Sequence, residues 1–255
     1  MLSKVKRPWL LATSTTLLVV STPGLANSAW DASLGAGVLY TPDYLGSDDY
    51  ETRVWPTINV SYGDRFYFNI RDGLGWNLIR HGNWKLSPFI GYIPGRDNDE
   101  DLERLDKIDG GAIAGLRVAY NHDAWSYSAA VQSPFTGDVD GYQVVLKARW
   151  RNQFSDQWFA SLGPNLTYSS DDWTDDRFGI SDTESARSGL ASYSPDGYAR
   201  YGLTGSLTYS LSAQWSVTAT AGVSQLTGDA EDSPIVSDIG EATQAYTGVF
   251  MSYRF

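Results

Sequence analysis

Residues 214–226 read Gln-Trp-Ser-Val-Thr-Ala-Thr-Ala-Gly-Val-Ser-Gln-Leu, and apolar side chains occupy every second position from Trp215 to Val223. The positions between them hold Ser, Thr and Gly. Because successive side chains of a β-strand point to opposite faces, this alternation predicts a strand with one apolar and one polar face. A helix would scatter the same residues around its circumference.

The same alternation recurs along the chain. It is found at residues 30–40, 84–92, 112–120, 125–131, 142–150, 158–168 and 201–209. One such segment is ambiguous, but a succession of them separated by turn residues is typical of an all-β protein. Segments of about ten residues that alternate in this way are also the signature of transmembrane β-barrels, whose strands face lipid on one side and the lumen on the other.

Connection lengths predict the topology. Short turns fall at 62–64, 81–83, 121–123 and 212–213, whereas 94–109, 171–196 and 227–241 are long, polar and acidic. Bacterial barrels have short periplasmic turns and long outer loops. The alternation is regular only if Asp72-Gly73 is an outer turn that divides 65–80 into two short strands. We therefore expect about twelve antiparallel strands with both ends of the barrel chain in the periplasm; ten strands, with 65–80 continuous, is the alternative.

Composition agrees with a barrel. The chain has no Cys, a net charge of −11, a mean hydropathy of −0.30, 10 Trp and 16 Tyr. Without Cys there is no disulfide framework, and the chain is too polar for a helical membrane protein. Abundant Trp and Tyr are typical of the two membrane interfaces. Five tryptophans begin expected strands, and we expect them to form a membrane girdle: Trp30, Trp84, Trp125, Trp158 and Trp215.

The N-terminal segment predicts export. Three basic residues within positions 4–7 precede an apolar stretch from Trp9 to Val20, and small residues follow up to Ala26. This is the pattern of a secretory signal peptide, and Thr13 to Thr16 interrupt the apolar stretch too early for a membrane-spanning helix. We expect cleavage after Ala26, with Ala29 as the alternative, so that 1–26 is the leader and 27–255 the barrel. Removing the three basic residues leaves 16 Lys and Arg against 30 Asp and Glu, a net charge of −14.

The C-terminal segment 249–255 places Val249, Met251, Tyr253 and Phe255 on one face. It resembles the C-terminal signal that the outer-membrane barrel assembly machinery recognises, with Tyr253 and Phe255 as the signal residues. The last strand must pair with the first, because closure removes both exposed edges. These features predict a protein of the Gram-negative outer membrane, in contact with outer-membrane lipid and lipopolysaccharide and with no nucleic-acid partner.

Several motifs resemble the MipA/OmpV family, named after the MltA-interacting protein. They are GVLYTPDYLGS at 37–47, YGDRFY at 62–67, GRD at 95–97, FGI at 178–180, SGL at 188–190, YSP at 193–195 and LTGDAEDSPIV at 226–236. The resemblance implies an outer-membrane β-barrel. For the namesake branch it also implies a scaffold that joins a periplasmic lytic transglycosylase to a bifunctional peptidoglycan synthase, whereas other members resemble adhesins or surface antigens. No scaffold-binding residue can be transferred, because the motifs lie mostly in loops.

The residues do not favour an enzyme. A nucleophile needs a neighbouring base, and the two histidines, His81 and His122, both fall in expected periplasmic turns. The acidic stretch 97–101 imitates the start of a calcium loop, but Leu102 replaces its obligatory Gly and Ile108 its bidentate Glu. We therefore expect no catalytic residue, no cofactor and no dedicated metal site. A loose divalent site that bridges lipopolysaccharide phosphates stays open, although a solvated acidic loop accounts for the same residues.

The expected lumen carries the opposite charge to the whole chain. Alternation places ten basic residues on the inner face: Arg53, Arg65, Arg71, Lys85, Arg117, Lys147, Arg149, Arg151, Arg200 and Arg254. Such a wall fits a small anion-preferring channel. It equally fits a barrel plugged by acidic loops, such as 94–109 or 171–177, that pair with the arginines. We favour the plug because a barrel of about twelve strands is narrow, and with it a non-enzymatic scaffold or surface protein over a channel.

Overall fold

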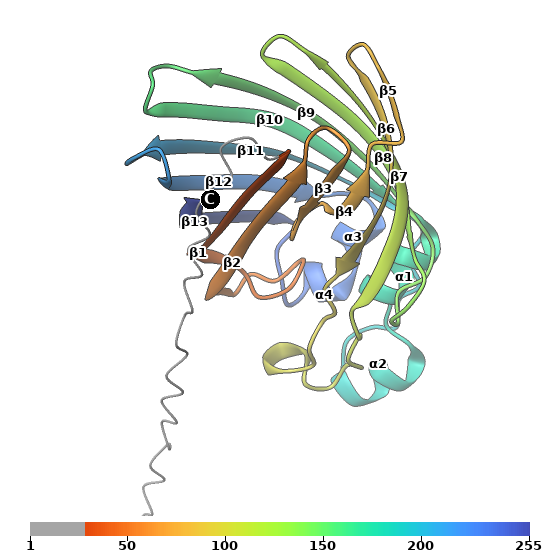
Figure 1. The fold of residues 1–255 in the computed structure, drawn as a ribbon. Helices are drawn as coiled ribbons and strands as arrows, with labels where there is room; N and C mark the ends of the chain where they lie inside the picture. Colours follow the sequence, from red (N-terminus) through yellow and green to blue (C-terminus); the bar gives the residue numbers. More distant parts are fainter. Residues whose placement is uncertain (1–28) are drawn as a thin grey trace, which may run out of the picture.

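A computed structural model describes residues 29–255, so the expected leader and its boundary at residue 27 lie outside the described residues. The strands of this range form one antiparallel sheet that curves into a barrel (Figure 1). They are β1 (Trp30–Pro42), β2 (Tyr50–Tyr62), β3 (Phe66–Asn69), β4 (Gly73–Trp76), β5 (Ile79–His81), β6 (Trp84–Ile93), β7 (Gly111–His122), β8 (Trp125–Pro134), β9 (Gln143–Gln153), β10 (Trp158–Ser169), β11 (Tyr198–Ser210), β12 (Trp215–Leu226) and β13 (Thr243–Arg254).

The first and last strands close the barrel along one seam. β1 pairs with β13 in continuous register from Ser33 opposite Arg254 to Tyr40 opposite Thr247. At the end of this seam the backbone N–H of Phe255 donates to the carbonyl of Ala32 at 3.0 Å. The C-terminal strand therefore has a partner on each side, which is the condition for a span in lipid.

A second, much shorter seam completes the ring. The β3–β4 hairpin turns at 70–72, and β4 meets β6 only through Leu74 opposite Ile90 and Gly75 opposite Phe89. β5 continues along the same edge of β6, so β4 and β5 act as one interrupted strand. The described wall is thus twelve-stranded, which confirms the expected fold, places the turn at Asp72-Gly73 on the same end as the long connections and excludes ten strands.

The alternation of the sequence corresponds to the two faces of the wall. Outward residues such as Leu34, Val38 and Val249 are 43–54% exposed, as expected for a surface that lipid covers. Inward hydroxyls pair across neighbouring strands: the Oγ atoms of Ser161 and Ser206 lie 2.8 Å apart, and those of Thr208 and Thr218 2.9 Å apart. The wall therefore has an apolar exterior and a polar lumen.

The connections differ sharply between the two ends. One end carries the short turns, and the other carries long connections that contain helices (Figure 1). These are η1 (Glu100–Leu102), α1 (Asp171–Phe178), α2 (Asp182–Ser188), α3 (Asp229–Asp232) and α4 (Pro234–Ser237). We expected plain loops here, and the helices differ from that expectation because their stability comes from tertiary packing rather than from length or propensity. Within residues 29–255, no helix reaches the length and apolarity needed to cross a bilayer.

The short seam provides a test of closure. Gly73 has a φ of +77°, and a Cβ placed there would lie 2.0 Å from the carbonyl oxygen of Ile90. Gly82 also has a positive φ, +56°, but a Cβ there would meet no atom within 4 Å. We expect Gly73→Ala to lower the midpoint urea concentration at which the barrel unfolds in lipid vesicles. Unfolding is monitored by tryptophan fluorescence. Gly82→Ala is the matched control, and it should lower the stability only by the cost of a left-handed alanine, about 1–2 kcal/mol. Equal midpoints for the two variants would contradict the importance of the β4–β6 seam.

Candidate functional site: a capped, basic chamber

The long connections pack together over one mouth of the barrel. We refer to residues 43–49, 94–109, 171–196 and 227–241 as the cap. Two apolar clusters hold it together, one around Phe178, Leu226 and Val236, the other around Leu102 and Ile235. All five side chains are at most 2% exposed. The cap therefore has a dry core of its own, rather than being a set of independent loops.

Local sequence explains how the cap helices begin and end. Ser181 and Glu184 form a reciprocal capping box at the start of α2, and Gly189 ends that helix in the left-handed conformation. Ser233 caps α4 by accepting from the N–H of Ile235. The same Ser233 hydroxyl donates to the carbonyl of Phe178 at 2.7 Å, which ties α4 to the end of α1. A single buried hydroxyl thus joins two connections that are far apart in sequence.

Beneath the cap lie three adjoining cavities of about 340, 230 and 360 Å³. All three share Asn165 of β10 as a wall residue, and together we name them the chamber. Among the described residues, the chamber is lined by two carboxylates, Asp43 and Asp72, and by eight basic side chains. The basic residues are Arg53, Arg71, Arg96, Arg117, Lys147, Arg149, Arg177 and Arg200.

The ten basic residues expected in the lumen separate into two groups. Arg53, Arg71, Arg117, Lys147, Arg149 and Arg200 line the chamber. The other four, Arg65, Lys85, Arg151 and Arg254, lie near the short-turn end, where Lys85 pairs with Asp64 at 2.6 Å and Arg254 with Asp31. Basic charge therefore lines the chamber at the capped end and also reaches the opposite rim.

The carboxylates that reach the chamber are not those we expected. Asp72, at the tip of the β3–β4 hairpin, lies 3.4 Å from Lys147 and 3.7 Å from Arg117. Arg117 also donates to the hydroxyl of Tyr67 at 2.7 Å and stacks over the ring of Phe89. The inward hairpin thus neutralises part of the wall.

The expectation that loops 94–109 and 171–177 pair with the wall arginines is wrong. Of the acidic residues in 94–109, Asp97 and Asp109 pair with Lys107, and Asp106 pairs with Arg187 of α2. These partners all belong to the cap. The loop 94–109 therefore satisfies its charges within the cap, whereas Asp43 at the edge of the cap pairs with Arg53 of the wall at 3.0 Å.

Two chamber residues were missed from the sequence. Arg96 follows β6 and Arg177 belongs to α1, and both lie in stretches that were read only as acidic loops. Arg96 is 8% exposed. Its Nη1 donates to the carbonyl of Arg177 at 2.5 Å, and Nη2 of Arg177 donates to the carbonyl of Pro94 at 2.6 Å. Arg96 falls in the GRD motif at 95–97, and Arg177 is a basic residue among acidic neighbours, but no periodicity assigns a face to a loop residue.

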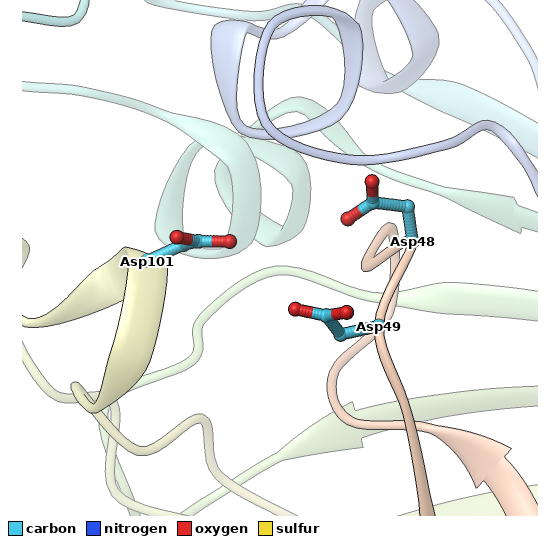
Figure 2. Close-up of side chains that lie close together, drawn as sticks. All are labelled: Asp48, Asp49 and Asp101. Carbon is cyan, nitrogen blue, oxygen red and sulfur yellow. The ribbon is translucent and has the colours of Figure 1, made fainter.

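An acidic cluster lies on the outer surface of the cap. Figure 2 shows Asp48 and Asp49, from the β1–β2 connection, facing Asp101 of η1. Each offers a carboxylate oxygen within 4.8 Å of the others, and all three side chains are exposed. Asp101 belongs to the stretch 97–101 that imitates a calcium loop, yet the cluster joins two different connections. Exposed carboxylates of this kind are solvated by water as readily as they bind a cation.

The girdle residues stand at one end of the wall. Trp30, Trp84, Trp125, Trp158 and Trp215 begin β1, β6, β8, β10 and β12, and each is 41–55% exposed. Four of them contact a tyrosine on the neighbouring strand at centroid distances of 4.7–5.0 Å. Tyr253 contacts both Trp215 and Phe255, so the two residues of the expected assembly signal lie beside this row of tryptophans.

The sequence relationships agree with this architecture. The family described as MltA-interacting protein MipA matches residues 34–255. The outer membrane protein YiaT of Escherichia coli K12 is 31% identical over 237 residues, covering 89% of this chain and 92% of YiaT. The MltA-interacting protein of the same organism is 28% identical over 253 residues, covering 94% and 96%. Among solved structures, the NanC porin aligns with a TM-score of 0.43 and 8% identity over 88% of this chain and all of that chain. The chain therefore belongs to the MltA-interacting protein MipA family and is an outer-membrane β-barrel.

Proposed function

We propose that this barrel is a non-enzymatic scaffold in the outer membrane that binds a periplasmic lytic transglycosylase. The family resemblance implies a peptidoglycan synthase as a second partner. The observation that carries the proposal is the cap: Phe178, Leu226 and Ile235 are at most 1% exposed, so one mouth of the barrel is filled by a packed core. A mouth closed in this way is poorly suited to free diffusion of solutes.

The relative that is named for an interaction supports an enzyme partner. The alignment with the MltA-interacting protein covers 94% of this chain and 96% of that protein, so neither protein has a large unmatched segment. His81 and His122 lie at the short-turn end, outside the chamber walls, and the exposed carboxylate of Asp123 lies 3.4 Å from His122, whose ring stacks on that of Tyr120. This arrangement supports a binding role better than catalysis. We take the short-turn end as the periplasmic one, because bacterial barrels keep their short turns there.

Binding to the transglycosylase should therefore depend on the short-turn rim and not on the cap. The rim variant combines Arg80→Glu with Asp156→Lys, both exposed. The matched cap variant combines Arg104→Glu with Asp99→Lys, also exposed and of equal charge change. We expect the rim variant to weaken capture of purified lytic transglycosylase by the detergent-solubilised barrel at least tenfold, and the cap variant to leave it unchanged.

Two results would count against the scaffold. Failure of the wild-type barrel to capture the transglycosylase would contradict it directly. Loss of capture by the cap variant alone would place the binding surface on the outer side, where an adhesin or surface antigen presents its contacts. Both variants change exposed side chains only, so folding of each is checked by the heat-dependent mobility of the barrel on a gel.

A second candidate, a small anion-preferring channel, is favoured by one observation. The chamber carries eight basic side chains against two carboxylates, and rings of charged side chains set the selectivity of pores. For this function the cap would have to open. The two candidates are therefore separated by the current that the intact barrel carries.

We expect the wild-type barrel to carry almost no current in planar bilayers. Leu102→Asn with Leu105→Asn should open it, because both side chains are at most 2% exposed and burying an amide there is costly. Asp99→Asn with Glu103→Asn, on the exposed side of the same loop, is the matched control and should stay silent.

Current through the opened variant should prefer anions, and adding Arg149→Glu should weaken that preference. Arg149 is suited to this test because it lines the chamber, and no carboxylate among the described residues lies within ion-pair distance of it. Large steady currents through the wild type would instead favour the channel.

A further inference from the structure

A concentration of unpaired positive charge lies in the cavity of about 340 Å³ directly beneath the cap. Arg96 reaches it from the β6–β7 connection, Arg177 from α1 and Arg200 from β11. Three separate parts of the chain therefore converge here with the same charge. A fourth arginine, Arg53, lines the cavity too, but Asp43 and Glu51 both pair with it.

The three guanidinium groups lack counter-charges. In the described part of the chain, no carboxylate comes within 4.0 Å of Arg96, Arg177 or Arg200. The Nε atom of each is buried and has no acceptor. The bonds from Arg96 and Arg177 to backbone carbonyls fix two of the groups in place but supply no negative charge. Buried donors without hydrogen-bond partners are rare in proteins, so each of these three groups calls for an explanation.

The carboxylate whose charge acts most strongly on Arg96, that of Glu184, is committed elsewhere. Glu184 accepts from the backbone N–H groups of Asp106 and Ser181 and from the hydroxyl of Ser181. These bonds hold its carboxylate in the capping box of α2, and Arg187 lies within 3.8 Å of it. Glu184 attracts Arg96 from a distance but forms no contact with it. These bonds keep the Glu184 carboxylate from forming an ion pair with Arg96.

Electrostatics points in the same direction. Burial lowers the pKa of Arg96 to about 10, the charge of Glu184 opposes this change, and the charge of Arg177 adds to it. Burial likewise lowers the pKa of Arg177; the charges of Tyr198 and Asp176 oppose this change, and the charge of Arg200 adds to it. A pKa of about 10 still leaves Arg96 charged at neutral pH, so the three like charges repel one another in a poorly hydrated space.

We propose that Arg96, Arg177 and Arg200 form a binding site for the carboxylate or phosphate group of one small organic anion. A guanidinium fork fits the two oxygens of either group. Tyr44, Leu45 and Phe178 line another part of the same cavity and give the organic body an apolar surface. The site is independent of the scaffold role, and it holds whether or not the anion crosses the barrel.

The test is calorimetric titration of the purified full-length barrel, in detergent without lipopolysaccharide, with phenyl phosphate. Inorganic phosphate serves as the probe without an organic body. We expect saturable binding of phenyl phosphate, tighter than that of inorganic phosphate. Arg200→Gln and Arg96→Gln should each weaken it at least tenfold. Arg104→Gln removes the same charge from an exposed cap arginine and should leave binding unchanged.

Stability of the free protein distinguishes this site from a structural role of the arginines. Arg200 makes no side-chain hydrogen bond or ion pair among the described residues, so Arg200→Gln should leave the unfolding midpoint of the ligand-free barrel unchanged or higher. A structural arginine would lower it. Titration in the presence of lipopolysaccharide separates the sources: competition assigns the anionic group to lipid, and absence of competition assigns it to a free anion.

The proposal is overturned if the wild type binds neither probe at millimolar concentration. Equal loss of binding in Arg104→Gln overturns it as well, because that result indicates general charge screening. It also fails if Arg200→Gln binds phenyl phosphate as tightly as the wild type. Failure of the transglycosylase capture, in contrast, concerns the opposite rim and leaves the arginine site standing.

Discussion

Every feature of this molecule depends on the need to pair backbone N–H and C=O groups inside a bilayer, where no water replaces a missing partner. The β1–β13 seam meets this need through eight residue pairs, from Ser33 opposite Arg254 to Tyr40 opposite Thr247. The β4–β6 seam meets it through two residue pairs, and β2 pairs with β3 only from Asn59 to Tyr62. The paired strands of the wall are therefore shortest beside the β3–β4 hairpin. At that place the chain turns inward, and Asp72 reaches Lys147 and Arg117 on the far strands.

The wall could be predicted from sequence because lipid and lumen impose opposite demands on adjacent residues. That contrast survives in each strand as an alternation, for example from Trp215 to Val223. The cap could not be predicted in the same way. Phe178 and Ile235 lie in short acidic segments, and they become core residues only because connections remote in sequence meet over the mouth. Helices this short carry little intrinsic stability, so capping residues such as Ser181 and Glu184 fix where α2 begins but do not by themselves predict a packed core.

The chamber was predictable only where it is made of strands. Arg117, Arg149 and Arg200 follow from alternation, since each occupies an inward position. Arg96 and Arg177 do not, because a loop residue has no face until the loop has folded. The expected ion pairs were wrong for a related reason: attraction between unlike charges says that acids and arginines can meet, but geometry decides which do. Here Asp97 and Asp106 met basic residues of the cap, whereas Asp43 met Arg53 of the wall.

Because the acids of 94–109 pair within the cap, the cap is held together without them reaching the wall arginines, and the chamber keeps its positive charge. Apolar contacts and hydrogen bonds such as that from Ser233 to Phe178 attach its parts to one another, and these interactions need no arginine of the wall. Had Asp97 or Asp106 reached into the lumen instead, the cap would have gained ion pairs and the chamber would have lost its charge. A chain with a net charge of −11 has ample acid to neutralise eight basic residues, yet within residues 29–255 the carboxylates that line the chamber are those of Asp43 and Asp72 alone. A cavity that stays basic against that excess of acid is one whose counter-charge is supplied from outside the chain.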